Sequence, residues 1–257
     1  MKIVVLVKQV PDTWGERKLD LATGLVDRDG VEAVIDEVGE RALEVALSYR
    51  DSDDAEVVVL SMGPASAKEI LRKGLAMGAD SAVHVLDDAL AGADLAWTAE
   101  VLAAAIGSIG FDLVVAGNES TDGRGGVIPA MIAEHLGVPH ATQLNSVEIT
   151  TGEVRGERGT DSGAADVRAP LPAVVSVTER LPEARFPNFR GIMKAKKKPL
   201  EVLTLADLGA EVSATRAARS VVVSTMERPP RAGGKKIVDD GHAGVELAEF
   251  LAAAHLI

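Results

Sequence analysis

Residues 113–136 read LVVAGNESTDGRGGVIPAMIAEHL, and this stretch decides the fold. Its first four residues, Leu113–Ala116, are apolar and precede a turn signal, which predicts a buried strand. After the turn, apolar residues recur at helical spacing, at Ile128, Met131, Ile132 and Leu136. The residues between form a loop from the carboxyl end of a strand to the start of a helix, which is where open α/β sheets bind ligands.

The composition of this loop suits a nucleotide. The backbone can approach a ligand closely at Gly117, Gly123, Gly125 and Gly126. Free N–H groups and the dipole at the start of the following helix favour a phosphate. Because the loop has neither G-x-G-x-x-G nor the lysine of a Walker A motif, two interpretations stay open: a nucleotide site, or a flexible glycine-rich connection.

Strands and helices alternate around this unit. Buried strands are predicted at Ile3–Val7, Val57–Leu60, Ala82–Leu86 and Leu171–Val177, and helices over Ile35–Tyr49, Ile70–Leu75 and Leu95–Ile106. We expect Asp36 to cap the first helix, with Glu37 and Glu40 in a first turn whose dipole favours carboxylates. The order predicts an α/β fold, a doubly wound Rossmann-like parallel sheet with right-handed crossovers.

The pattern changes after Pro139. Two alternating segments, Val147–Ile149 and Val154–Arg158, predict an antiparallel hairpin extension of the sheet. From Glu179 onward the sequence predicts an extension outside the core, which ends in an extended C-terminal arm with a short amphipathic helix over Val245–Leu251. We therefore expect a nucleotide-binding domain at 1–220 and an arm at 221–257 that packs on a partner.

The composition excludes several classes of function. The 257 residues contain no cysteine, which excludes disulfides and thiol chemistry, and the formal net charge of −12 argues against general nucleic-acid binding. No apolar run approaches membrane-spanning length and no signal-peptide pattern is present, so we expect a cytoplasmic protein without membrane insertion. No histidine pair has metal-ligand spacing, and no nucleophile, base and orienting group form an autonomous active site. These features indicate a binding protein rather than an enzyme.

A basic run stands out near residue 195. Two of the four phenylalanines, Phe186 and Phe189, lie close to prolines, and Ile192–Lys198 (IMKAKKK) follows in an otherwise acidic chain. Taken alone, a run of this kind predicts a solvated face.

Five segments together resemble the beta subunit of electron transfer flavoprotein. They are Val4–Asp12 (VVLVKQVPD), Gly74–Asp80 (GLAMGAD), Gly117–Gly123 (GNESTDG), Leu171–Val175 (LPAVV) and Ile192–Lys198 (IMKAKKK). The resemblance covers nearly the whole chain, and the five segments together, in this order, make it specific. The resemblance implies an adenine nucleotide alpha hydrolase-like fold and a heterodimer whose alpha subunit holds most of the redox FAD.

The resemblance also implies a role in electron transport. The beta subunit would bind AMP structurally, complete the FAD environment and dock acyl-CoA and other dehydrogenases, as in fatty acid oxidation. Electrons would pass through FAD to a quinone-linked oxidoreductase. One alternative is an electron-bifurcating relative with a second FAD in place of AMP. A stand-alone ATP-binding enzyme is another, although the Ser-Gly-Gly-x-Asp-Ser loop is absent after the first strand.

The resemblance assigns site residues by position. The AMP site would comprise Leu6, Asp36, Glu37, Val38, Gly39, Met62, Gly117, Asn118, Glu119, Ser120, Thr121, Asp122, Gly123, Arg124, Gly125, Gly126, Val127 and Ile128. The recognition loop for dehydrogenases would lie within 183–198, with Phe189 where the family has an anchoring leucine. Basic residues that would contact the partner are Lys194, Lys196, Lys197 and Lys198. Ala165 occupies the position of a frequent family glutamate.

Overall fold

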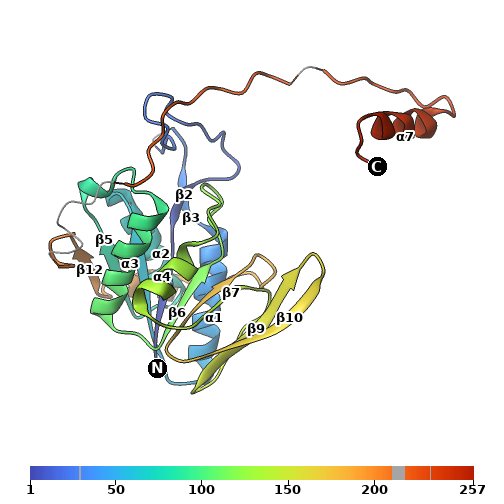
Figure 1. The fold of residues 1–257 in the computed structure, drawn as a ribbon. Coiled ribbons are helices and arrows are strands. Elements are labelled where there is room, and N and C mark those ends of the chain that lie inside the picture. The colour runs from blue at the N-terminus through green and yellow to red at the C-terminus, as the bar shows by residue number, and fades with distance from the viewer. Residues whose placement is uncertain (29, 210–217, 232) are drawn as a thin grey trace. The chain divides into compact units, whose positions relative to one another are not determined.

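The computed structural model describes residues 1–28, 30–209, 218–231 and 233–257. In these residues a mostly parallel sheet forms the centre, and helices cover both of its faces (Figure 1). The predicted doubly wound α/β fold is therefore confirmed.

The sheet is built around five parallel strands in the order β11-β6-β1-β4-β5. These are β1 (Lys2–Leu6), β4 (Glu56–Met62), β5 (Ser81–Val85), β6 (Leu113–Gly117) and β11 (Ala173–Val177). Nearly every residue of β4, β5, β6 and β11 is buried, which explains their continuous apolar sequences. Their carboxyl ends meet at one edge of the sheet, where the loop after β6 lies.

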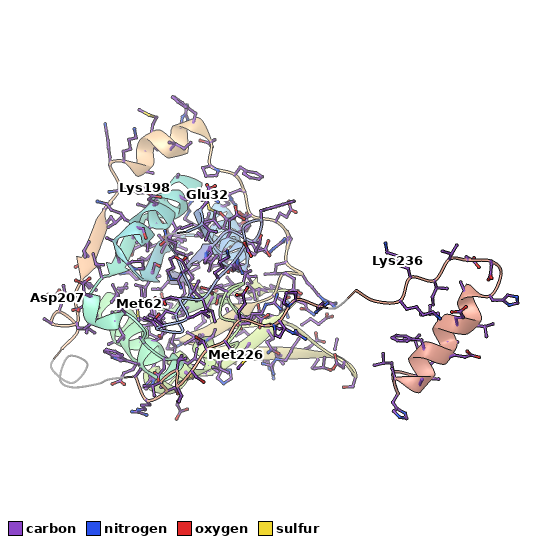
Figure 2. The ribbon with its side chains drawn as sticks, turned by 90° about the horizontal axis from the view of Figure 1, so that it is seen from above. Glu32, Met62, Lys198, Asp207, Met226 and Lys236 are labelled. Carbon is purple, nitrogen blue, oxygen red and sulfur yellow. The ribbon has the colours of Figure 1, made fainter. Side chains whose placement is uncertain are left out.

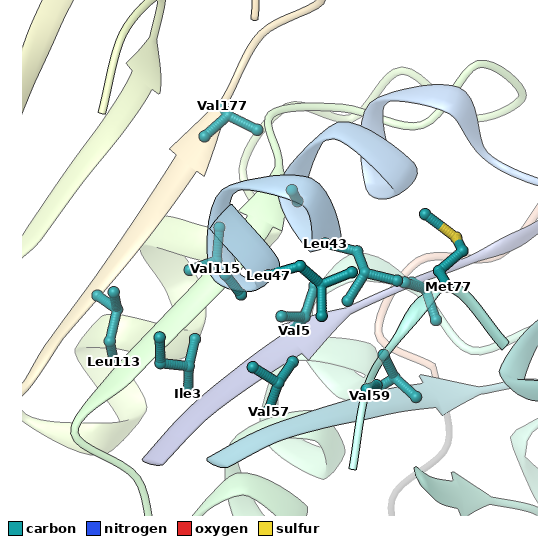
Figure 3. Close-up of a cluster of buried hydrophobic side chains, with 14 of the residues drawn as sticks. Ile3, Val5, Leu43, Leu47, Val57, Val59, Met77, Leu113, Val115 and Val177 are labelled. Atoms are coloured by element: carbon teal, nitrogen blue, oxygen red, sulfur yellow. The ribbon is translucent and has the colours of Figure 1, made fainter. Parts of the chain in front are cut away.

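Two pairs of helices enclose the sheet. One face packs on α1 (Glu37–Ser52) and α2 (Lys68–Met77), and the other on α3 (Leu95–Ile109) and α4 (Ile128–Leu136). Short 3₁₀ turns, η1 (Ala65–Ala67) and η2 (Asp88–Leu90), precede α2 and α3. Figure 3 shows Leu43 and Leu47 of α1 above the strand residue Val5, all of them fully buried.

The sheet contains strands that the sequence did not predict. β7 (His140–Leu144) pairs parallel with β11, and β9 (Glu153–Thr160) forms a long antiparallel hairpin with β10 (Gly163–Pro170). The predicted hairpin corresponds to β8 (Glu148–Ile149) and β9, which do pair antiparallel. The predicted β8–β9 pair is therefore only the smaller part of the antiparallel extension, and the larger part is the hairpin of β9 and β10.

The expectation that residues after Glu179 lie outside the core is wrong. β12 (Leu200–Leu203) adds a parallel strand beside β5, and the side chains of Ala195 and Leu205 are buried in the two core clusters. The short helix α5 (Phe189–Ala195) packs against α2. This segment completes one edge of the sheet because β5 would otherwise leave its backbone groups unpaired there.

A polar excursion separates β1 from α1. It is bracketed by β2 (Gln9–Pro11) and β3 (Ala33–Ile35), which pair antiparallel with each other outside the main sheet. The pairing of β2 with β3 therefore holds the end of the excursion in place, directly before the start of α1.

The described residues divide into two units, Met1–Ser224 and Thr225–Ile257. The second contains α7 (Ala243–Ala253), at the place of the predicted amphipathic helix. No residue of α7 is buried, and Val245, Leu247 and Phe250 are each more than half exposed. The packing of this arm on a partner stays a prediction. No helix among the described residues is both long and apolar enough to cross a membrane.

Candidate functional site

The candidate site is the loop that follows β6, together with the start of α1. Asp36 is the N-cap of α1, as predicted, and its Oδ1 accepts from the Val38 N–H at 3.1 Å. Its other oxygen, Oδ2, accepts from the backbone N–H of Thr121 at 2.7 Å and from the Thr121 hydroxyl at 2.9 Å. A single buried carboxylate therefore joins the helix to the loop.

Asp122, the next residue of the loop, is held by two cations. Its side chain is 2 % exposed and lies 2.8 Å from Lys8 Nζ and 3.2 Å from a guanidinium nitrogen of Arg28. Burial opposes ionisation of Asp122, but hydrogen bonds from Lys8 and Ser120 and the charge of Lys8 lower its pKa to about 2. Asp122 is therefore ionised at neutral pH and pairs with both cations.

The structure favours glycine at two positions of the loop for different reasons. At Gly117 a Cβ would lie 3.2 Å from the backbone carbon of Val38, so a side chain there would push α1 away from β6. Gly126 has a φ of +66°, in the left-handed region that favours glycine. α4 begins directly after these residues and has no side-chain hydrogen bond at its N-cap, Val127. Pro129 has no N–H, so the N–H groups that this first turn leaves for another acceptor are those of Ile128 and Ala130.

A hollow of about 310 Å³ lies against this loop. It is lined by Glu37, Val38, Asn118, Glu119, Ser120, Thr121, Arg124 and Glu179. Three of these are glutamates, and the exposed Arg124 is the only cation among them. Asn118 lines the hollow, and its Oδ1 is buried and accepts no hydrogen bond from the described residues.

The structure brings most of the predicted residues together at this edge of the sheet. Several of them do not line the hollow. Leu6 and Met62 are half-buried and pack on the cluster under α3 and α4. Gly39 lies against the backbone at the end of β1, where a Cβ on this glycine would be 3.7 Å from Leu6 O. Residues 125–127 lead into α4, which begins at Ile128, and none of these four residues lines the hollow.

Several residues at this edge were not predicted. Lys8 and Arg28 hold Asp122, Glu179 lines the hollow, and Arg17 donates to Thr121 Oγ1 at 3.1 Å and to Pro11 O at 2.6 Å. Lys8 directly follows the predicted strand Ile3–Val7, and that position was an available signal. No local pattern marks Arg17 or Arg28, because each becomes a neighbour of the loop only through the fold.

The residues proposed for partner contacts lie elsewhere, on and around α5. Phe189 is the first residue of this helix and is 80 % exposed, and Phe186 is 89 % exposed. These exposures contradict a core role for Phe189 within this chain. Lys194, Lys196 and Lys197 are exposed, whereas Lys198 is half-buried and donates to backbone carbonyls.

The described residues contain no group of three or more histidine or carboxylate side chains arranged to hold a metal ion. The site at the sheet edge combines a hollow, a buried acceptor without a partner among the described residues, and a helix start without a side-chain cap.

Comparison with known proteins gives consistent matches. Residues 23–208 match the family described as Electron transfer flavoprotein domain. The chain is 49 % identical over 264 residues to the electron transfer flavoprotein subunit beta of Mycobacterium leprae, with 99 % of each chain covered. It is 35 % identical over 261 residues to the subunit of the same name from Thermoanaerobacterium thermosaccharolyticum, with both chains covered completely. From the sequence motifs, the fold and these matches, the chain belongs to the electron transfer flavoprotein family, as a beta subunit.

Proposed function

We propose that this chain forms a heterodimer with an electron transfer flavoprotein alpha subunit and binds AMP at the carboxyl edge of its sheet. In this role it has no active site of its own. It stabilises the dimer, completes the environment of the FAD held mainly by the alpha subunit, and docks dehydrogenases. Electrons would then leave through FAD to a quinone-linked oxidoreductase.

The observation that carries AMP binding is the unpaired acceptor beside the uncapped helix. The glutamate-rich hollow is unfavourable for a phosphate but offers acceptors for hydroxyl and amino groups, as found on ribose and adenine. The first turn of α4, preceded by Gly125 and Gly126, offers N–H groups and a positive dipole end. We therefore assign the nucleoside to the hollow and the phosphate to the start of α4.

The loop is also preorganised for a ligand. Asp36 and Asp122 hold Thr121 and its neighbours through contacts within the chain. A loop that is already ordered loses less conformational entropy when a ligand binds, so more of the contact energy appears as affinity.

Two exposed aromatic side chains support dehydrogenase docking. Phe189 and Phe186 lie next to the cations Arg190, Lys194, Lys196 and Lys197 in a chain of net charge −12. An exposed aromatic ring can fill a partner's apolar pocket, while surrounding cations favour a partner with an acidic rim. We propose Phe189 as the anchor and the exposed lysines as steering residues.

The first prediction is the nucleotide content of the purified heterodimer. We expect one AMP and one FAD per heterodimer after extraction, measured by chromatography against standards. Two FAD and no AMP would instead support the electron-bifurcating alternative. ATP turnover by the isolated chain would support a stand-alone ATP-binding enzyme.

The second prediction concerns the glycine at the start of α4. Gly126→Val should abolish AMP retention, because a β-branched side chain is strained at this φ and intrudes where the phosphate should lie. Gly137→Val is a matched control: Gly137 has the same φ of +66°, but a Cβ there meets nothing within 4 Å. The control should lose stability but keep AMP, and Arg124→Ala should also keep it. Normal AMP content in Gly126→Val would mean that the phosphate lies elsewhere.

The third prediction concerns pH. The pKa of Asp122 is about 2, below the value of ~3.9 for an unfolded chain. Its stabilising contribution should be complete above pH ~4 and decline as the pH falls toward 2. Asp122→Asn should lower the free energy of unfolding at pH 7 by roughly 1 to 2 kcal/mol and flatten this pH dependence. Denaturant unfolding from pH 7 to pH 3 measures both effects.

Glu148→Gln is the control for the pH experiment. Glu148 pairs with Arg155, but both side chains are more than half exposed, so water screens the pair and its loss should change little. Equal effects of the two substitutions would contradict a special role for Asp122.

The fourth prediction tests the docking anchor. Phe189→Ala should slow electron transfer from an acyl-CoA dehydrogenase by roughly tenfold, equivalent to about 1.4 kcal/mol of docking free energy. FAD content and melting temperature should not change, because the ring is 80 % exposed. Phe186→Ala, at an equally exposed ring nearby, should have a smaller effect. A loss of cofactor and stability in step with the rate would contradict the docking role of Phe189.

A further inference from the structure

The helix α5 needs its neighbours to hold it in place. It has seven residues, which is too few for a helix to be stable on its own. It nevertheless exposes apolar side chains, with Phe189 80 %, Met193 50 % and Ile192 46 % exposed. Such side chains bind a partner well only if the backbone that carries them is already ordered.

Lys198, three residues beyond α5, reaches the carboxyl end of α2. Its Nζ donates to the backbone oxygens of Leu75 at 3.1 Å and Gly78 at 2.9 Å, and also to that of Ala79. Burial lowers the pKa of this ammonium group. Figure 2 labels Lys198 near the short helix, and its hydrogen bonds connect this position to the carboxyl end of α2.

A cation of α2 likewise donates to backbone oxygens at and after the end of α5. A guanidinium nitrogen of Arg72 donates to Ala195 O at 2.7 Å and to Lys198 O at 3.3 Å. The last carbonyls of a helix have no partner within the helix, and the dipole makes this end attractive to cations. The carboxyl end of each helix therefore receives a cation: Lys198, which follows α5, reaches the end of α2, and Arg72 of α2 reaches the end of α5.

A close backbone contact completes the attachment. A Cβ on Gly191 would lie 2.3 Å from Ala76 O, so only glycine allows α5 to approach α2 this closely. At the start of α5, Asn188 Oδ1 accepts from the Gly191 N–H at 2.8 Å. α5 is thus held at both ends.

We propose that Lys198 and Arg72 are positioning residues, which fix α5 so that its exposed apolar side chains are presented in one orientation. This inference rests on the docking role proposed above. Lys198 acts through the backbone of its own chain, while Lys194, Lys196 and Lys197 are left to act on the partner by charge.

The test compares Lys198→Met with Lys197→Met in the heterodimer. The two variants lose the same charge one residue apart, but only Lys198 contacts α2. Hydrogen exchange of residues 189–195 is measured without a dehydrogenase. Steady-state KM and kcat are then measured with an acyl-CoA dehydrogenase, with the heterodimer as the varied substrate, at low and high salt.

Lys198→Met should speed exchange in 189–195 and raise KM about fivefold at both salt concentrations, with kcat and FAD content unchanged. Lys197→Met should leave exchange unchanged and raise KM only at low salt, because salt screens an exposed charge. Gly191→Ala should reproduce the Lys198→Met result without a change of charge.

Three outcomes distinguish the attachment of α5 by Lys198 from the docking function of its exposed side chains. Unchanged exchange in both Lys198→Met and Gly191→Ala would overturn the inference, as would a KM effect of Lys198→Met that disappears at high salt. Faster exchange with an unchanged KM would support the attachment of α5 by Lys198 but contradict the docking function itself.

Discussion

The buried carboxylate of Asp36 is the interaction on which the edge of the sheet depends. It serves both the first turn of α1 and the backbone of Thr121, 85 residues later in the chain. Burying a carboxylate is unfavourable unless hydrogen bonds compensate it. Moving the loop would remove two of its three partners, so the glycine-rich loop has a preferred conformation despite its composition.

Asp122 extends this principle to the excursion after β1. Its two cations, Lys8 and Arg28, come from opposite ends of that excursion, so the loop, β1 and the excursion share one charged centre. Arg17 adds a link from the middle of the excursion to Thr121. The polar segment that interrupts the βα alternation is therefore part of the framework of the site.

The sequence predicted the parts of the fold that depend on local or fully buried patterns. β4 and β6 lie in the middle of the sheet, and burial on both faces gives them continuous apolar sequences. The Asp36 cap was predictable because it is a contact between near neighbours in the chain. By contrast, β7 (HATQL) and β12 (LEVL) are short and partly exposed, and their place in the sheet follows from pairing with distant strands.

The functional residues divide in the same way, into those marked by a local pattern and those brought together by the fold. The glycine loop could be predicted from its position after a buried strand, whereas Arg28 and Glu179 reach the site only through tertiary structure. Which lysine of the basic run turns inward likewise depends on the helix end that lies beneath it.

The bonds that hold the loop also constrain the order in which the chain can fold during synthesis. Lys8 and Asp122 are 114 residues apart in sequence, so the first strand and the excursion leave the ribosome long before their loop partner exists. Until β6 pairs with β1, Lys8 and Arg28 lack the Asp122 counter-ion, and the start of α1 lacks the Thr121 contact. The edge proposed to bind the nucleotide can therefore form only after the loop that follows β6 has been synthesised, and a nascent chain that stops before Asp122 cannot assemble it.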